Sequence, residues 1–116
     1  MDFAWSDQQR ELLDAVSRFA REELNYDVIE NDRNAIFNHD AWKKCGDFGI
    51  QGLLVPAEYG GLAQDPLTTV AALEGLGYAC KDNGLLFSIN AHMWTAVIPL
   101  VYNGSETQKK KYLPGL

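Results

Sequence analysis

The stretch FGIQGLLVPAEYGG, residues Phe48 to Gly61, decides how this chain folds. It combines four glycines and one proline with a run of apolar residues, and no metal ligands or obvious nucleophile lie beside it. Its glycines match neither G-x-G-x-x-G after a strand nor a P-loop, so a phosphate-binding loop is not indicated. Leu53–Val55 is short and has no partner strand. We therefore predict a packed connection between two helices. Gly60 and Gly61 should then take the positive φ that glycine adopts easily.

Length, composition and charge limit the class of protein. The chain has 116 residues, which fits one domain, and its hydrophobic fraction of 47% is ordinary for a globular protein. All of the net charge of −6 falls within residues 1–40, so the rest of the chain is neutral overall. Nucleic-acid binding needs a basic surface, and the short run Lys109–Lys111 does not supply one.

The chain shows no targeting or membrane signal in its sequence. No basic start followed by an apolar run is present, and we find no window that approaches the roughly 20 apolar residues of a membrane span. Cys45 and Cys80 are not part of a C-x-x-C or Cys/His pattern. We expect two free, partly buried thiols and a soluble, cytoplasmic protein without a metal site.

Helical patterns cover nearly the whole chain. Capping boxes at Ser6–Gln9 and Ser105–Gln108, and the pair Asp65-Pro66, mark helix starts. Residues 25–38 contain four asparagines and predict a loop or a broken helix. We expect about five helices and no strand. The first lies at 6–24, and the second runs from 38 or 39 to Gly46 or Gly49. The third begins at 65 and ends where Asn83-Gly84 breaks the chain, the fourth lies at 85–102, and the fifth runs from 105 to Leu113. The fold class is all-α.

Two of these helices have unusual composition. In the third, Val70, Leu73 and Gly77 share one face, which we expect to be packed. Gly75 and Gly77 each cost up to about 1 kcal/mol relative to alanine, so another backbone should approach there. The fourth, Leu85–Tyr102, is almost uncharged and should be central, with Pro99 kinking or ending it.

Few residues could carry catalysis. The two histidines are His39, near a helix start, and His92, on the central helix. Most acidic residues occupy polar helix faces, and Glu58 in the glycine-rich loop is best explained by a structural role. These observations predict no catalytic residue, no metal ligand and no cofactor-binding residue in this chain.

Four motifs in order carry a resemblance. They are SDQQRELLDAVSRFAREEL near the start, WKKCGDFGIQGLLVPAEYGG, AALEGLG, and GSETQKKKYLP from Gly104 to Pro114. At this spacing, residues 1–116 resemble the N-terminal helical domain of the acyl-CoA dehydrogenase family. The resemblance implies an orthogonal bundle of about five helices.

The resemblance also implies a reaction. Family members are flavoenzymes that oxidise an acyl thioester to its 2,3-enoyl form, with a glutamate taking the α-proton and FAD taking a hydride from the β-carbon. A middle β-domain and a C-terminal helical domain, for which residues 1–116 have no counterpart, hold FAD and the base. The implied partners are an acyl-CoA or acyl-carrier-protein thioester, those FAD-binding domains and further copies in a homo-oligomer. Alone, the chain should be inactive and bind no stoichiometric FAD.

In the family, the helix equivalent to Leu85–Val101 lines the acyl pocket. Aligned on Ile98-Pro99, the implied substrate-binding residues are Ser88, Ala91, His92 and Thr95. A polar lining of this kind would suit a polar acyl group or a carrier-protein substrate. Two alternatives remain open: a stand-alone helical interaction module, and the corresponding domain of an acyl-CoA oxidase or a flavin monooxygenase.

Overall fold

The computed structural model describes residues 3–116 and contains helices but no strand in that range. The α-helices are α1 (Asp7–Glu23), α2 (Val28–Arg33), α3 (His39–Phe48), α4 (Pro66–Ala79), α5 (Asn83–His92), α6 (Ile98–Asn103) and α7 (Glu106–Tyr112). Short turns form η1 (Ala57–Tyr59), η2 (Met93–Val97) and η3 (Leu113–Gly115). Since α5, η2 and α6 are continuous, the described residues form six helices, and the expected all-α class is confirmed. The additional short helix, α2, lies in the asparagine-rich segment.

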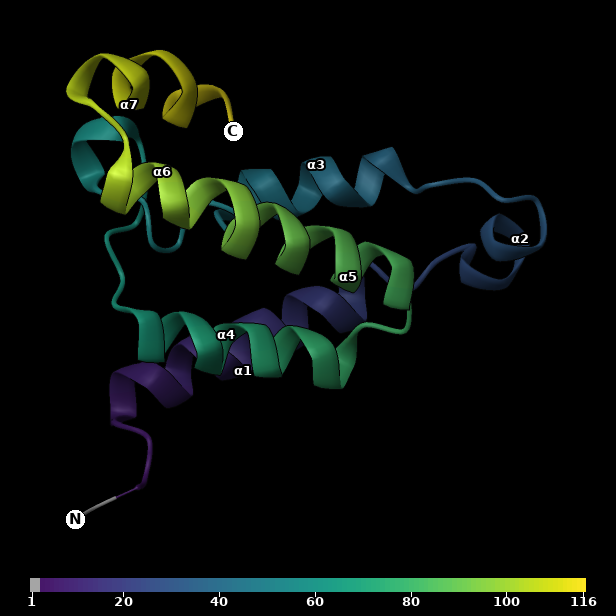
Figure 1. Cartoon of the computed structure of the whole chain (residues 1–116). Helices are drawn as coiled ribbons and strands as arrows, with labels where there is room; N and C mark the ends of the chain where they lie inside the picture. The colour runs from purple at the N-terminus through teal and green to yellow at the C-terminus, as the bar shows by residue number, and fades with distance from the viewer. Residues whose placement is uncertain (1–2) are drawn as a thin grey trace.

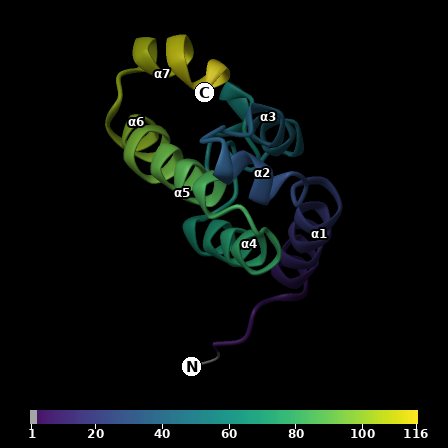
Figure 2. The ribbon, with the colours of Figure 1, turned by 90° about the vertical axis from the view of Figure 1, so that its right-hand side faces the viewer.

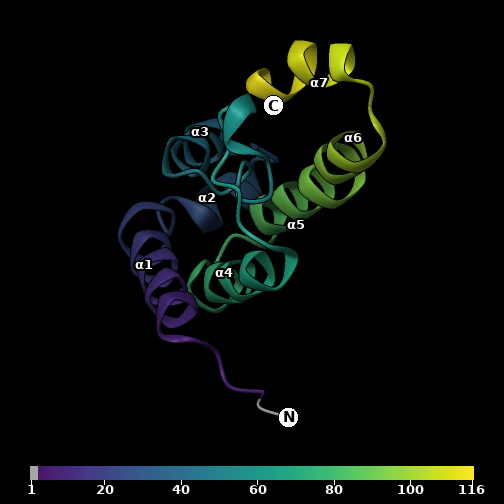
Figure 3. The same ribbon diagram turned by 90° about the vertical axis from the view of Figure 1, so that its left-hand side faces the viewer.

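The helices form two parts joined by a long rod. α1 and α4 lie side by side, and the rod of α5, η2 and α6 runs past α4 on one side and α3 on the other (Figures 1 and 2). α7 lies over the C-terminal end of the rod, while α2 lies at its N-terminal end, where α5 begins (Figure 3). The rod is therefore the element that connects the two ends of the domain.

Side-chain caps begin most helices where the sequence predicts. Ser6 and Ser105 form complete capping boxes with Gln9 and Gln108, and Asp65 accepts a hydrogen bond from the Thr68 amide. One boundary was wrong. Asn83 and Gly84 do not break the chain but form the first turn of α5, because the Asp82 carboxylate accepts from the Leu85 amide and caps the helix there.

The glycine-rich stretch forms a closed loop after α3. Gly49 ends α3 with a φ of 104°, and Gly60 follows η1 with a φ of 90°. Gly61 is required for a different reason than expected, because it lacks a positive φ. A Cβ at Gly61 would lie 2.0 Å from the Val55 carbonyl oxygen, so only glycine fits against that backbone.

Backbone hydrogen bonds hold this loop together without a strand. The Leu62 amide donates to the Gly52 carbonyl at 3.0 Å, and the Gln64 amide donates to the Leu53 carbonyl at 2.7 Å. Buried side chains from Leu53 to Val55 point into the domain, as expected for a packed connection. The loop therefore satisfies its buried backbone internally.

Two apolar clusters form the interior. The larger joins α1, α3, α4 and α5, and its largest fully buried members are Val16, Leu24, Ile50, Leu53, Leu76, Leu85, Ile89 and Met93. The smaller contains Val55, Tyr59, Val97 and Leu113 and joins the glycine-rich loop to α6 and α7. There the Tyr59 hydroxyl lies 2.8 Å from both carboxylate oxygens of Glu106. This bond connects the VPAEYGG and GSETQKKKYLP motifs.

The helix pair α1 and α4 meets at a glycine. A Cβ at Gly75 would lie 2.8 Å from the Leu13 carbonyl oxygen, and the Ser17 hydroxyl donates to the Gly75 carbonyl at 3.1 Å. The expected packed face of α4 was wrong in part. Leu73 is half-buried, but Val70 is 45% exposed and nothing lies within 4 Å of a Cβ at Gly77. Because α4 is apolar on most sides, its pattern did not identify the inner face.

The rod passes Pro99 without breaking. Before it, Met93–Val97 forms a π-helical turn, in which the Ile98 amide donates to the Met93 carbonyl five residues back. This turn accommodates the proline, which has no amide hydrogen and would crowd the carbonyl of a regular helical turn. Gly104 then ends the helix, as predicted.

The uninterrupted rod corrects the expectation that no segment has the length of a membrane span. Asn83–Asn103 is one helix of 21 residues that is long and apolar enough to cross a bilayer. The test concerns length and composition only, and a core helix of a soluble protein can pass it. Here one face of the rod is occupied by the two apolar clusters.

Both cysteines are free and buried. Burial raises the pKa of the Cys45 thiol to about 12 and also raises the pKa of the Cys80 thiol. Since the thiolate is the reactive form, these side chains serve as small core residues.

Substituting the two glycines of α4 should have opposite effects. Gly75→Ala should lower the free energy of unfolding by about 1–3 kcal/mol, because the added methyl group overlaps the α1 backbone. Gly77→Ala should raise it by about 1 kcal/mol, since that site is open and alanine favours the helix. Urea unfolding followed by circular dichroism measures both, and equal stabilities for the two variants would contradict the α1–α4 contact.

The Tyr59–Glu106 bond should make stability fall at alkaline pH. This bond, and then burial, raise the pKa of Tyr59 from 10.0 to about 12. Folding therefore favours the neutral phenol. Its contribution to the free energy of unfolding is complete below pH 10 and is lost between pH 10 and about 12. Urea unfolding across this pH range measures the effect. The free energy of unfolding should fall less in Tyr59→Phe than in the parent chain, whereas in Tyr78→Phe, a change at an exposed tyrosine, it should fall as in the parent.

Candidate functional site

The central rod presents distinct faces to its surroundings. Leu85, Ile89, Met93 and Val97 recur every four residues and are buried, so they define the core face. Ser88, Ala91, His92 and Thr95 lie together on a neighbouring side of the same helix. The first three are half-buried and Thr95 is exposed. The structure therefore brings the four predicted substrate-binding residues into one polar stripe at the edge of the core.

The two hydroxyls of the polar stripe differ in their bonding. Ser88 has no hydrogen-bond partner among the described residues, so its hydroxyl can both donate and accept. The Thr95 hydroxyl donates to the Ala91 carbonyl at 2.5 Å, which leaves its oxygen as an acceptor. Ala91 lies between them at helical spacing i, i+3, i+7 and contributes only a methyl group. The two hydroxyls therefore lie about 10 Å apart along the axis, with the Ala91 methyl group between them.

His92 lies on the side of the polar stripe that faces α3. Its ring meets the Trp42 indole edge-to-face, with centroids 5.3 Å apart and an interplanar angle of 75°. The Nε2 atom is shielded from solvent and has no hydrogen-bond partner in the described part of the chain. A buried polar atom without a partner is costly, so an additional group from a ligand or a neighbouring domain would be stabilising here.

Trp42 is the residue of this site that sequence reasoning missed. It is half-buried, packs against the larger apolar cluster and contacts His92. Behind it, Gln51 donates from Nε2 to the Trp42 carbonyl at 3.2 Å, while its buried Oε1 has no partner. The position of Trp42 inside the WKKCGDFGIQGLLVPAEYGG motif was the available signal. Contact with a histidine 50 residues away could not be deduced from it.

The groups with shifted pKa values lie away from the polar stripe. The Tyr26 hydroxyl donates to Asp40 at 2.5 Å and lowers the pKa of that carboxyl, and Lys44 lies 3.4 Å from the same group. Hydrogen bonding to the Thr68 amide lowers the pKa of Asp65. These interactions hold helix ends in place, and the stripe itself contains no carboxylate that could act as a base.

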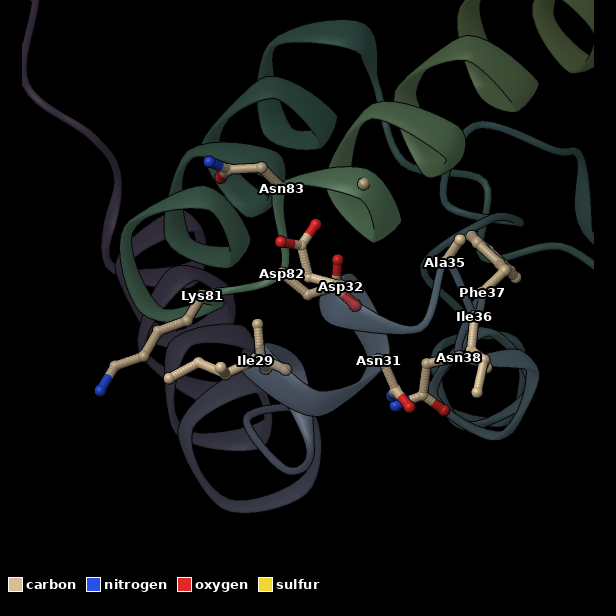
Figure 4. A pocket seen from close by; sticks show the side chains of 12 residues that line it. Ile29, Asn31, Asp32, Ala35, Ile36, Phe37, Asn38, Lys81, Asp82 and Asn83 are labelled. Atoms are coloured by element: carbon tan, nitrogen blue, oxygen red, sulfur yellow. The ribbon is translucent and has the colours of Figure 1, made fainter.

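A cavity of about 530 Å³ lies elsewhere, between α2 and the start of α5 (Figure 4). Its lining includes Ile29, Asp32, Ile36, Lys81 and Asp82. None of the four residues of the polar stripe lines it, so it is a separate feature of the surface.

Five helix starts in the described part of the chain are capped by side chains. A flavin dinucleotide needs donors for its pyrophosphate, commonly the free amides of a helix N-terminus. The starts of α1, α3, α4, α5 and α7 are instead occupied by the side chains of Ser6, Asn38, Asp65, Asp82 and Ser105. Between residues 3 and 116, no group of three or more His, Cys, Asp or Glu side chains could hold a metal ion.

Comparisons with known proteins agree with this architecture. The chain is 32% identical to the L-prolyl peptidyl-carrier-protein dehydrogenase of Pseudomonas fluorescens, over 100% of this chain and 30% of that protein. It is 37% identical to the mitochondrial isovaleryl-CoA dehydrogenase of Pongo abelii, over 96% of this chain and 26% of that protein. The chain thus spans about a third or less of the length of these relatives.

Solved structures show the same domain. The prolyl acyl carrier protein oxidase AnaB superposes with a TM-score of 0.92 and 53% identity, covering 96% of this chain and 29% of that one. PigA with FAD and proline gives a TM-score of 0.92 and 35% identity, covering 99% and 30%. The family model for the acyl-CoA dehydrogenase N-terminal domain matches residues 6–116. The chain therefore belongs to the acyl-CoA dehydrogenase family, as its N-terminal domain.

Proposed function

We propose that this domain forms the acyl-binding side of a flavin-dependent enzyme that oxidises a carrier-bound prolyl thioester. The identity of 53% to a prolyl acyl carrier protein oxidase carries this proposal. The polar stripe of α5 and η2 supports it, because its small Ala91 side chain and two hydroxyls suit a compact, polar acyl group better than a long aliphatic one.

The chemistry of a prolyl group matches the groups that the polar stripe offers. Its five-membered ring is compact and carries one secondary amine, which needs a polar partner when removed from water. The Ala91 methyl group is small enough to lie beside the ring, and either the Ser88 or the Thr95 oxygen can accept from the amine. The contact of His92 with Trp42 holds the polar stripe against α3. The domain thus binds and orients the acyl group.

The catalytic base and the flavin site belong to parts of the enzyme outside this chain. The polar stripe has no carboxylate, and the starts of α1, α3, α4, α5 and α7 are capped by side chains. PigA binds FAD in its solved complex, in a protein of which this domain covers 30%. A purified 116-residue chain should therefore contain no stoichiometric flavin and oxidise no thioester. A flavin absorbance corresponding to one FAD per chain would contradict this division of roles.

A larger side chain at Ala91 should impair oxidation of a prolyl substrate. The assay uses a chimaera in which this chain replaces the matching domain of the prolyl acyl carrier protein oxidase, with prolyl-carrier protein and isovaleryl-CoA as substrates. Ala91→Leu should lower kcat/KM for the prolyl substrate by about tenfold or more, equivalent to about 1.4 kcal/mol, because leucine occupies the space of the ring. Ala57→Leu, an exposed alanine in η1, is the matched control and should have no effect.

His92→Leu tests the polar character of the site in the same chimaera. It should reduce the preference for the prolyl substrate over isovaleryl-CoA. An unchanged preference in both His92→Leu and Ala91→Leu would remove the polar stripe from the acyl site. Efficient oxidation of isovaleryl-CoA by the parent chimaera would instead favour an acyl-CoA substrate, consistent with the 37% identity to isovaleryl-CoA dehydrogenase.

A further inference from the structure

We propose that the cavity between α2 and the start of α5 binds a small aliphatic molecule that carries both an ammonium and a carbonyl group, as an α-amino acid amide does (Figure 4). The cavity has a volume of about 530 Å³, which is within the range of small-molecule sites. Since it is separate from the polar stripe, this proposal does not depend on the oxidation of a prolyl thioester.

Two carboxylates from different elements line the cavity. Asp32 belongs to the last turn of α2, and Asp82 is the N-cap of α5 (Figure 4). Asp82 accepts from the Leu85 amide through Oδ1, which leaves Oδ2 free. The Asp32 carboxylate has no hydrogen bond or ion pair within the described part of the chain. Because like charges destabilise each other, a cation between the two carboxylates would be stabilising.

No positive charge of the domain neutralises these carboxylates. Lys81 is the only Lys or Arg among the residues that line the cavity, and Figure 4 shows its side chain directed away from Asp32 and Asp82. Among residues 3–116, no group of three or more His, Cys, Asp or Glu side chains could hold a metal ion. The pair therefore favours an organic cation over a metal.

Asn38 supplies a hydrogen-bond donor to the same cavity. This side chain is only 8% exposed, and its Oδ1 accepts from the Ala41 amide at 3.0 Å and from the Tyr26 hydroxyl at 3.3 Å. These bonds fix the orientation of the amide and leave Nδ2 without a partner among the described residues. Figure 4 shows the side chain directed from the start of α3 toward α2. An acceptor oxygen placed there would satisfy a largely buried donor.

The rest of the lining is mainly apolar and open. Ile29 is 76% exposed and Ile36 is 56% exposed, and both line the cavity together with Val28, Ala35 and Phe37. Covering exposed apolar surface contributes roughly 25 cal/mol per Å². A ligand with an aliphatic side chain would therefore gain affinity from this wall.

The three kinds of groups together define the class of ligand. A simple amine would pair with the carboxylates but leave Asn38 unsatisfied, and a neutral amide would do the reverse. A free amino acid has the ammonium, but Asp32 and Asp82 would repel its carboxylate. An α-amino acid amide combines the ammonium, the carbonyl oxygen and the aliphatic side chain in one small molecule without a negative charge.

Binding of L-leucinamide to the purified 116-residue chain tests the proposal. Backbone amide chemical shifts, recorded during a titration, should change most around Ile29 and Ile36 and give a Kd. Asp32→Asn should raise this Kd by about fivefold or more, because it removes a charge that pairs with the ammonium. Asp27→Asn is the matched control. It removes the same charge from the start of the same helix, but Asp27 does not line the cavity, so the Kd should be unchanged.

Three analogues, tested on the parent chain, each change one feature of the ligand. N-acetyl-L-leucinamide lacks the ammonium, 3-methylbutylamine lacks the carbonyl, and L-leucine carries a carboxylate in place of the amide. Each should bind about fivefold or more weakly than L-leucinamide. Because this series needs no substitution in the protein, it does not depend on the stability of a variant.

Folding is checked by the Tm of each variant. Asp32→Asn should keep the Tm of the parent, since its carboxylate makes no bond in the described structure. The proposal would be overturned by the absence of shift changes around α2, by an equal Kd for Asp32→Asn and the parent, or by binding of 3-methylbutylamine that is as tight as that of L-leucinamide. The assay contains no flavin or thioester, so none of these results bears on the proposed oxidation.

Discussion

The contact between the backbones of Val55 and Gly61 is the constraint on which the rest of the domain depends. No side chain fits at Gly61, because the Val55 carbonyl occupies that space. This close approach folds the segment between α3 and α4 into a compact loop, which sets the position of Tyr59 in the second apolar cluster. From there Tyr59 reaches Glu106 at the start of α7. A steric requirement at one glycine therefore positions a helix that begins 45 residues later.

The central rod has three faces that carry different side chains. One face fills the core with Leu85, Ile89 and Met93. A second carries Ser88, Ala91 and Thr95, and a third carries Phe87 and Trp94. The rod has no Asp, Glu, Lys or Arg between Asp82 and Glu106.

Sequence reasoning succeeded where a local signal determined the structure. Ser6, Asp65 and Ser105 begin helices because their side chains bond nearby amides, and such bonds depend on neighbours in the chain. It failed where several faces were equally apolar. Val70 and Ala72 could not be ranked by periodicity, and the neighbour of α4 decided between them. The four residues of the polar stripe were placed by family resemblance, while their support by Trp42 needed the structure.

The π-helical turn at Met93–Val97 allows one helix to pack against both apolar clusters. An α-helix advances by about 100° per residue, so one extra residue in a turn rotates everything that follows. Before the turn the rod faces the larger cluster, and after it Leu100 and Val101 face the smaller one. Deleting a single residue here would restore a regular helix but turn its second half away from α7. A change of length in this segment would therefore move the second half of the rod, whereas an exchange of side chains would leave its direction unchanged.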